Sequence, residues 1–372
     1  MSSVPFIDLK TQYKALKESI DSRIMKVLES GAYISGPEVA ELEQKLAQHT
    51  GVNHVLACAS GTDALLIPMM ALGIGPGDEV ITTGFSFIAT AETIVLAGAK
   101  PIYVDIDPRT YNIDPKAIEK AITPKTKAIV PVSLYGQMAD MDEILALAKK
   151  HNLFVLEDLA QSYGAQYKGK KSGSMAIASG TSFYPAKPLG CYGDGGAIFT
   201  NDSKLATIMK EIREHGSEKR YYHTRLGVNG RLDTIQCAVL LAKMERYDWE
   251  VEQRQRVADR YNQAFSEIKA PEFSIPYVKE DRNSVWAQYT LTVQNRPEFQ
   301  KKLQEKGIPT SVHYPMTMAD QPWYKEHTAG ASAHIPHARW AADHVVSLPM
   351  FPDMDNATQD RVIEAVISAL KG

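Results

Sequence analysis

The sequence predicts an α/β protein with a mainly parallel sheet in the first two thirds of the chain. Strand-like and helix-like segments alternate there, as they do where helices join parallel strands. The strand-like segments are short, β-branched and apolar on both faces, which is typical of strands covered by helices on each side. With 372 residues, 44% of them hydrophobic, the chain can form one large and one small domain.

Seven segments are expected to form the strands of this sheet: residues 54–59, 79–83, 101–105, 127–133, 153–158, 180–184 and 196–200. Helical patterns lie at residues 38–49, 63–72, 89–97, 115–121 and 141–151. Pro37 precedes the first of them, in the position that proline favours in a first turn. From about residue 247 the composition changes, with one long charged helix at 250–268 followed by strands and short helices. We therefore expect a large α/β domain at residues 1–250 and a smaller α+β domain at 251–372.

Charge and cysteine content argue against several classes of protein. Lys and Arg (41) nearly balance Asp and Glu (44) without a basic cluster, so neither a nucleic acid nor an anionic membrane is expected as a partner. The first residues lack a leader pattern and no apolar stretch could span a bilayer, so we expect a cytoplasmic protein. Cys58, Cys191 and Cys237 are widely spaced, which fits a reducing compartment. The C-terminal histidines are interrupted by Pro336 and lack a carboxylate pattern, so no metal site is expected.

Lys187 is the first candidate catalytic residue. It lies between Pro185 and Pro188, after a strand-like segment and shortly before the glycine-rich run at 193–196. A lysine that is partly desolvated in such a place has a lowered pKa and becomes an amine nucleophile at neutral pH. The best-known use of such an amine is a Schiff base with the carbonyl of a substrate or of pyridoxal phosphate (PLP). The alternative is a loop lysine that points into water.

Two further features lie where predicted strands end. The segment 60–63, Ser-Gly-Thr-Asp, begins a helix, so its amides could seat a phosphate, although Ser60 or Thr62 could instead be an ordinary N-cap. Asp158 ends an apolar strand, where a buried carboxylate needs a cationic partner. A protonated pyridine nitrogen would serve, and so would a Lys or Arg side chain.

An aromatic pair completes the set. Phe85 and Phe87 follow the strand at 79–83 and could supply a face for a flat ring, or else pack in the core. Ligands of such sheets bind at the carboxyl ends of the strands. A phosphate seat, a carboxylate for a ring nitrogen, an aromatic face and the amine of Lys187 together predict a PLP site.

The motifs around these residues resemble those of the DegT-type sugar aminotransferases, which are fold-type-I PLP enzymes acting on nucleotide-linked keto sugars. The resemblance rests on residues 60–65, 157–165, 182–196 and 229–236 and extends over essentially the whole chain. Within the family the chain looks most similar to the UDP-2-acetamido-2-deoxy-3-oxo-glucuronate aminotransferases of O-antigen and lipopolysaccharide synthesis. The resemblance implies a cytoplasmic homodimer with a shared active site that moves an amino group from L-glutamate to C3 of a UDP-linked 3-keto sugar. Pyridoxamine phosphate would be the intermediate form of the cofactor.

The resemblance also implies roles for individual residues. Lys187 forms the Schiff base and moves the proton, and Asp158 pairs with the pyridine nitrogen. The other cofactor contacts are implied for Gly61, Thr62, Phe87, Gln161, Ser182 and, from the second subunit, Asn229. The candidates on the substrate side are Arg231, His313 and Tyr314. Many members have His where this chain has Tyr163, after Ser162, so the ring contact from that position is not carried over.

Two other functions stay open. Arg231 suits the carboxylate of a uronate but equally that of glutamate, so an aminotransferase for a dTDP-3-keto-6-deoxyhexose is the alternative substrate assignment. A non-catalytic sugar-nucleotide sensor or regulator is the alternative of another class. Relatives that dehydrate deoxysugars carry His in place of the lysine, so the presence of Lys187 argues against that chemistry.

Overall fold

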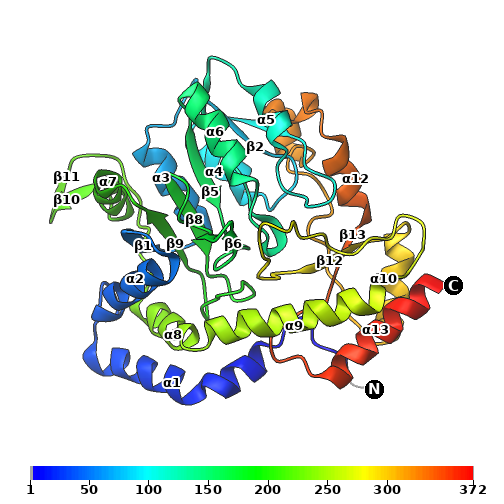
Figure 1. The fold of residues 1–372 in the computed structure, drawn as a ribbon. Coiled ribbons are helices and arrows are strands. Elements are labelled where there is room, and N and C mark those ends of the chain that lie inside the picture. The colour runs from blue at the N-terminus through cyan, green and yellow to red at the C-terminus, as the bar shows by residue number, and fades with distance from the viewer. Residues whose placement is uncertain (1–2, 372) are drawn as a thin grey trace.

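A seven-stranded sheet forms the centre of the first two thirds of the chain in the computed structural model, which describes residues 3–371 (Figure 1). Its strands lie in the order β1-β9-β8-β5-β4-β2-β3, and of these only β9 runs against its neighbours. The expected α/β fold with a mainly parallel seven-stranded sheet is confirmed. The strands are β1 (His54–Cys58), β2 (Glu79–Thr83), β3 (Lys100–Val104), β4 (Thr126–Val130), β5 (Phe154–Asp158), β8 (Ala178–Ser182) and β9 (Gly196–Thr200).

Helices cover both faces of the sheet, because its strands are apolar on both sides. One face is covered by α3 (Gly61–Ala71), α4 (Ala89–Leu96) and α7 (Ser203–Arg213). The other is covered by α2 (Pro37–Thr50), α5 (Pro115–Ala121), α6 (Met141–His151) and α8 (Thr234–Met244). The long helix α1 (Leu9–Ser30) packs on α8 through Leu16 and Ile20 (Figure 1). The five helices predicted in this region are confirmed, whereas α1, α7 and α8 were not predicted.

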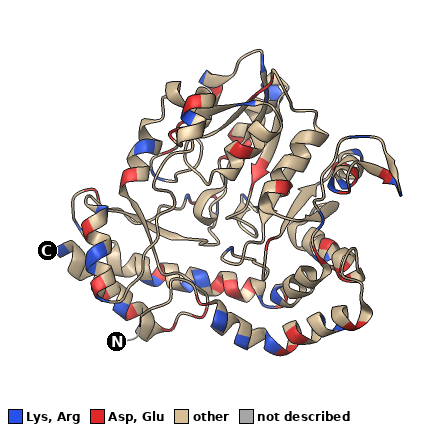
Figure 2. Cartoon of the chain, turned by 180° about the vertical axis from the view of Figure 1, so that it is seen from behind, with Lys and Arg blue, Asp and Glu red and all other residues tan. Residues whose placement is uncertain are grey.

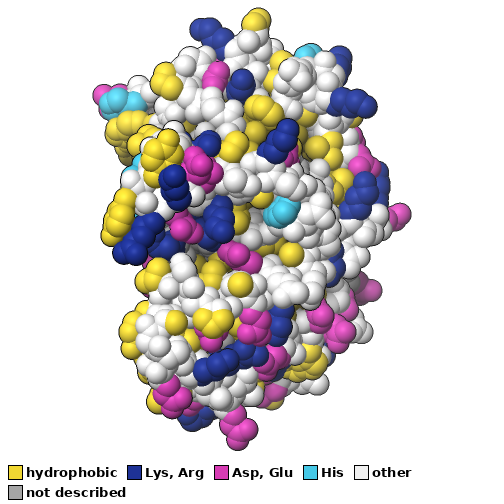
Figure 3. Space-filling model, turned by 90° about the vertical axis from the view of Figure 1, so that its left-hand side faces the viewer, with side chains coloured by type: hydrophobic (Ala, Val, Ile, Leu, Met, Phe, Trp, Pro, Cys, Tyr) yellow, Lys and Arg dark blue, Asp and Glu magenta, His cyan; other side chains and the backbone are white. Residues whose placement is uncertain are grey.

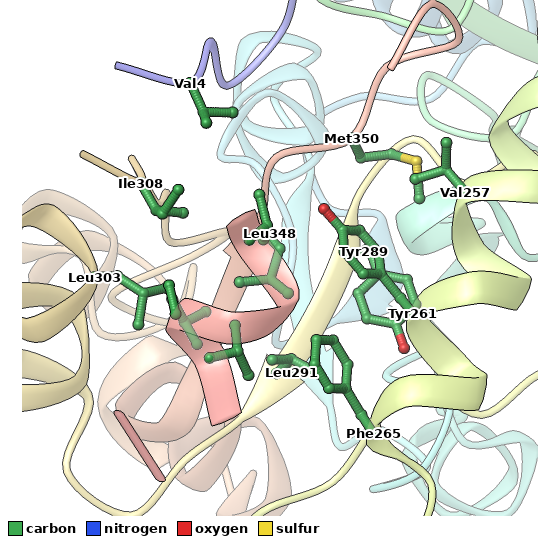
Figure 4. Packing of buried hydrophobic residues seen from close by; sticks show 14 of the residues in the cluster. Val4, Val257, Tyr261, Phe265, Tyr289, Leu291, Leu303, Ile308, Leu348 and Met350 are labelled. Carbon is green, nitrogen blue, oxygen red and sulfur yellow. The ribbon is translucent and has the colours of Figure 1, made fainter. Parts of the chain in front are cut away.

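The last third of the chain has a core of its own. The helix α9 (Tyr247–Phe265) begins before the expected domain boundary at residue 250 and continues past it. Tyr261 and Phe265 of α9 face Tyr289 and Leu291 of β12 (Tyr289–Thr292), which pairs with β13 (Val345–Leu348) (Figure 4). Val4 joins the same core, so the start of the chain packs with its end. The division at residue 250 stays a prediction.

The remaining elements are short or lie at the periphery. Two small antiparallel pairs join β6 (Gln166–Tyr167) to β7 (Lys170–Lys171) and β10 (Ser217–Lys219) to β11 (Tyr222–His223). The C-terminal helices are α10 (Arg296–Glu305), α11 (Pro322–His327), α12 (Pro336–His344) and α13 (Asn356–Lys371), and the 3-10 turns are η1 (Leu134–Gly136) and η2 (Ala329–Ser332). Charges of both signs lie along α1 and α9 (Figure 2). Within residues 3–371 no helix has the length and apolar character needed to cross a membrane.

Candidate active site

The six strands that point the same way bring their carboxyl ends to one edge of the sheet, and α3 begins there. Two glycines let its first turn approach the strands. A Cβ atom on Gly196 of β9 would lie 2.3 Å from the carbonyl oxygen of Ser60, and one on Gly180 of β8 would lie 2.6 Å from that of Ala64. The helix N-terminus is therefore held directly against β8 and β9.

The first turn of α3 has the geometry of an anion seat. The Ser60 hydroxyl accepts a hydrogen bond from the amide of Asp63 at 3.1 Å, so the N-cap alternative is confirmed for Ser60. The cap leaves the amides of Gly61 and Thr62 without an acceptor inside the helix. Gly61 lies against Ser182, whose Cβ atom would be 2.6 Å from a Cβ on Gly61. Gly61, Thr62 and Ser182, for which the resemblance implies cofactor contacts, thus lie together, and they fit a phosphate group.

Asp158 is a buried carboxylate at the end of β5. It is 5% exposed, and its oxygens accept hydrogen bonds from the Thr90 hydroxyl at 2.7 Å and from the amide of Ala160 at 3.1 Å. Burial raises the pKa of Asp158, opposed by these two hydrogen bonds and by the charge on Lys187. No Lys or Arg of residues 3–371 forms an ion pair with it at 4.0 Å or less, so the salt-bridge alternative is not realised. A buried carboxylate in this state fits a cationic ring nitrogen as its partner.

Lys187 lies in a tight loop between β8 and β9, on the same edge. Its amide donates to the carbonyl oxygen of Tyr184 at 2.8 Å, and the loop is closed where the amide of Cys191 donates to the carbonyl oxygen of Phe183 at 2.7 Å. Burial lowers the pKa of Lys187, and the negative charge of Asp158 opposes this shift. The side chain is half-buried, and it is close enough to Asp158 for the charge of that residue to affect its pKa. The alternative of a lysine in open water is therefore wrong.

The two phenylalanines differ in role. Phe85 is fully buried, between the rings of Tyr111 and Tyr314, and is a core residue. Phe87 is 54% exposed, and its ring centre lies 5.9 Å from that of Tyr314. Only Phe87 of this pair offers an open face to a flat ring.

Gln161 connects two parts of the site. Its Oε1 accepts a hydrogen bond from the amide of Tyr135 at 2.9 Å, and its Nε2 donates to the phenol oxygen of Tyr314 at 3.0 Å. Ser162 and Tyr163 turn away from it: Ser162 Oγ lies 2.9 Å from Ser172 Oγ, and the ring of Tyr163 is buried in the core. Position 163 therefore does not reach the ring site in this chain.

His313 and Tyr314 come from the C-terminal third, yet they lie beside the lysine and the carboxylate. Burial, with the charge of Lys187 as a second cause, lowers the pKa of His313 to about 4. Burial and the charge of Asp158 raise the pKa of Tyr314. At neutral pH both side chains are uncharged, and His313 Nδ1 is held 2.9 Å from Ser347 Oγ. The site thus places a neutral imidazole and a neutral phenol next to the amine.

Arg231 and Asn229 lie at the base of the β10–β11 hairpin. The backbone of the half-buried Arg231 forms a β-bridge with that of Cys58 at the end of β1, and its buried Nε has no hydrogen-bond partner among the described residues. Asn229 is exposed and bridges to Glu214 through its backbone. The guanidinium therefore has hydrogen-bonding capacity that the chain itself does not use.

Three residues that contact the site were not predicted from the sequence. Thr90 binds Asp158, Ser347 binds His313, and Tyr135 donates to Gln161 through its amide and to the carbonyl oxygen of His313 through its hydroxyl. None of the three carries a motif of its own. For Thr90 the signal was its place one turn after Phe87, at the start of a predicted helix.

Comparisons with known proteins agree with this geometry. The model of the DegT/DnrJ/EryC1/StrS aminotransferase family matches residues 14–367. The UDP-2-acetamido-2-deoxy-3-oxo-D-glucuronate aminotransferase of Pseudomonas aeruginosa is 53% identical, over 95% of this chain and 97% of its own length. A pleiotropic regulatory protein of Geobacillus stearothermophilus is 46% identical, over 98% of each chain. Among solved structures, that of DesV from S. venezuelae in complex with a ketimine intermediate has a TM-score of 0.96 at 37% identity and covers 99% of each chain.

Proposed function

Because the chain belongs to the DegT/DnrJ/EryC1/StrS aminotransferase family and is a PLP-dependent enzyme, we propose that it moves the amino group of L-glutamate to C3 of UDP-2-acetamido-2-deoxy-3-oxo-glucuronate. The single observation that carries this substrate is the high identity, over nearly the full length, to the Pseudomonas enzyme named for it. The product would be the UDP-linked 3-amino uronate, used for surface polysaccharide. Three buried free cysteines support a cytoplasmic location.

PLP supplies an aldehyde that condenses with amines and a protonated ring that accepts the electron pair left when a proton departs from the attached carbon. Lys187 provides the amine that holds the aldehyde, and its lowered pKa favours the unprotonated nucleophile. Once glutamate has displaced it, the free amine of Lys187 would serve as the base that takes the proton from the α-carbon of glutamate and as the acid that later returns it. The cofactor would carry the amino group between the two substrates, so that 2-oxoglutarate is released from glutamate and the ketone of the sugar becomes an amine.

The other residues of the site would bind and orient the cofactor. Asp158 would pair with the ring nitrogen and keep it protonated, while the first turn of α3 and Ser182 would hold the phosphate. The exposed ring of Phe87 would cover one face of the cofactor ring. Gln161 has its Oε1 bound to the amide of Tyr135 and one Nε2 hydrogen bound to Tyr314, so its second Nε2 hydrogen would be available to the ring hydroxyl.

Arg231 is proposed to bind the carboxylate of the uronate. A bidentate arginine–carboxylate pair contributes about 1.5–3 kcal/mol, so Arg231→Ala should lower kcat/KM for the keto-uronate by roughly 10- to 100-fold. The loss with a neutral dTDP-3-keto-6-deoxyhexose should be much smaller, with glutamate held at a saturating concentration. Equal losses with both sugars would contradict a role of Arg231 in binding the carboxylate of the uronate.

The substrate proposal is tested by giving the PLP-loaded enzyme L-glutamate and either the UDP-keto-uronate or the dTDP-keto-deoxyhexose, and measuring the 3-amino sugar formed. The uronate should have the higher kcat/KM. A higher value for the dTDP sugar would support the alternative assignment. No amino sugar and no 2-oxoglutarate from any donor would favour the sensor or regulator alternative.

We also propose that two copies of the chain share each active site. The β10–β11 hairpin projects from the molecule, with Tyr221 83% and Leu226 81% exposed (Figure 1). Exposed hydrophobic side chains are mixed with Lys and Arg on this side of the molecule (Figure 3). Such a surface is typical of an interface, and Asn229 at its base would reach the partner's phosphate. Mixing inactive Lys187→Ala with inactive Asn229→Ala subunits should restore activity in part; no restoration would contradict a shared site.

A further inference from the structure

Two side chains of α8 hold the end of the loop that carries Lys187. The Nζ of Lys243 donates to the carbonyl oxygen of Gly190 at 2.5 Å. The Oε1 of Gln236 accepts from the amide of Tyr192 at 2.9 Å, and its Nε2 donates to the carbonyl oxygen of Tyr192 at 3.4 Å. Gln236 and Lys243 are seven positions apart, which is close to two helical turns, so both project from the same face of α8.

Contacts within the loop couple the position of Gly190 to that of Lys187. A Cβ atom on Gly190 would lie 2.6 Å from the carbonyl oxygens of both Tyr184 and Pro185, so the loop folds tightly on itself. The amide of Lys187 is bound to the carbonyl oxygen of Tyr184, one of the two groups that Gly190 touches. A shift of Gly190 therefore requires a shift of the turn in which Lys187 lies.

Burial of Lys243 is energetically unfavourable for the folded protein. The residue is 2% exposed, its neighbours on α8 are apolar, and its Nζ lies 4.6 Å from the ring centre of Tyr192. Burial lowers the pKa of Lys243 to about 8, opposed mainly by the charge of Glu250. No carboxylate of residues 3–371 lies within ion-pair distance of 4.0 Å. A buried ammonium in this state lowers stability relative to an apolar side chain of similar length, so stability does not explain its presence.

We propose that Lys243, together with Gln236, is a positioning residue that fixes the loop of Lys187 so that the amine points at the aldehyde of the bound cofactor. The inference rests on the proposed role of Lys187. It assigns to α8 a part in cofactor capture, although none of its side chains is among the residues proposed to touch the cofactor.

The test compares Lys243→Met with the wild type. Methionine has similar length and keeps the packing but cannot hold the carbonyl group. Lys171→Met is the matched control, because Lys171 Nζ also donates to a backbone carbonyl oxygen, that of His49 at 2.6 Å. The measurements are the melting temperature of the apoprotein, the dissociation constant for PLP from the yellow absorbance band, and the rate at which borohydride traps PLP on Lys187, identified by peptide mass.

Lys243→Met should melt no lower than the wild type yet bind PLP at least about tenfold more weakly, since the loop loses a hydrogen bond to a charged group. Lys171→Met should bind PLP as the wild type does. Unchanged affinity and trapping in Lys243→Met would overturn the inference. If this variant does not fold, Gln236→Leu decides in its place: weaker PLP binding by a folded protein supports the inference, and unchanged binding overturns it. A wild type that never traps PLP on Lys187 would instead overturn the proposed function, and the inference with it.

Discussion

Mild acid should destabilise the apoprotein through His313. In the folded chain burial holds the pKa of His313 at about 4, against 6.5 for an exposed histidine. As the pH falls below 6.5, His313 therefore binds a proton in the unfolded chain but stays neutral in the folded chain. The free energy of unfolding is thus lost between pH 6.5 and 4. The linkage relation gives a loss of about 2 kcal/mol between pH 7 and pH 5 from this group alone.

The assay is urea unfolding of the apoprotein at both pH values, for the wild type and for His313→Gln. Other acid-sensitive groups act in both proteins, so the difference between their pH dependences isolates His313. The wild type should lose about 2 kcal/mol more than the variant on going from pH 7 to pH 5. His151→Gln, at an exposed position at the end of α6, is the control and should behave like the wild type. Equal losses in the wild type and in His313→Gln would refute the claim that His313 is buried and neutral.

Three further substitutions test the site. Lys187→Ala should abolish transamination and borohydride trapping of PLP while the melting temperature stays within a few degrees, and substantial turnover would remove Lys187 from its role. Asp158→Asn should lower kcat by about 100-fold or more with no loss in urea stability, because it removes a charge that burial disfavours; unchanged kcat would make the carboxylate merely structural. Gly61→Ala should weaken PLP binding by about tenfold in an absorbance titration, because its Cβ meets Ser182 at 2.6 Å. The control Gly75→Ala, whose Cβ would have its nearest neighbour at 3.7 Å, should bind PLP normally.

The sheet could be predicted from the sequence because its strands are short apolar segments that alternate with segments of helical pattern. That pattern locates the carboxyl ends, and with them Ser60, Asp158 and Lys187, at one edge. The proximity of Asp158 and Lys187 then follows from topology, and the structure adds that each feels the charge of the other.

Other parts could not be predicted, for identifiable reasons. The helix α8 is buried nearly all round, so its sequence has no polar stripe to reveal a helical period. The β10–β11 hairpin consists of short exposed strands without alternation. His313 lies more than a hundred residues from Lys187 and was assigned through the resemblance alone. The hydrogen bond from Lys243 to Gly190 joins the loop of Lys187 to a helix that was not predicted. The sequence of neither segment therefore indicated this contact.

The most direct test of the central claim is the absorbance spectrum of the PLP-loaded protein before and after addition of L-glutamate, with 2-oxoglutarate measured in the same sample. The account predicts that the yellow band disappears with release of one 2-oxoglutarate for each active site, and that the UDP-keto-uronate restores the band. A protein that takes up PLP but neither bleaches nor releases 2-oxoglutarate would contradict an aminotransferase that uses glutamate.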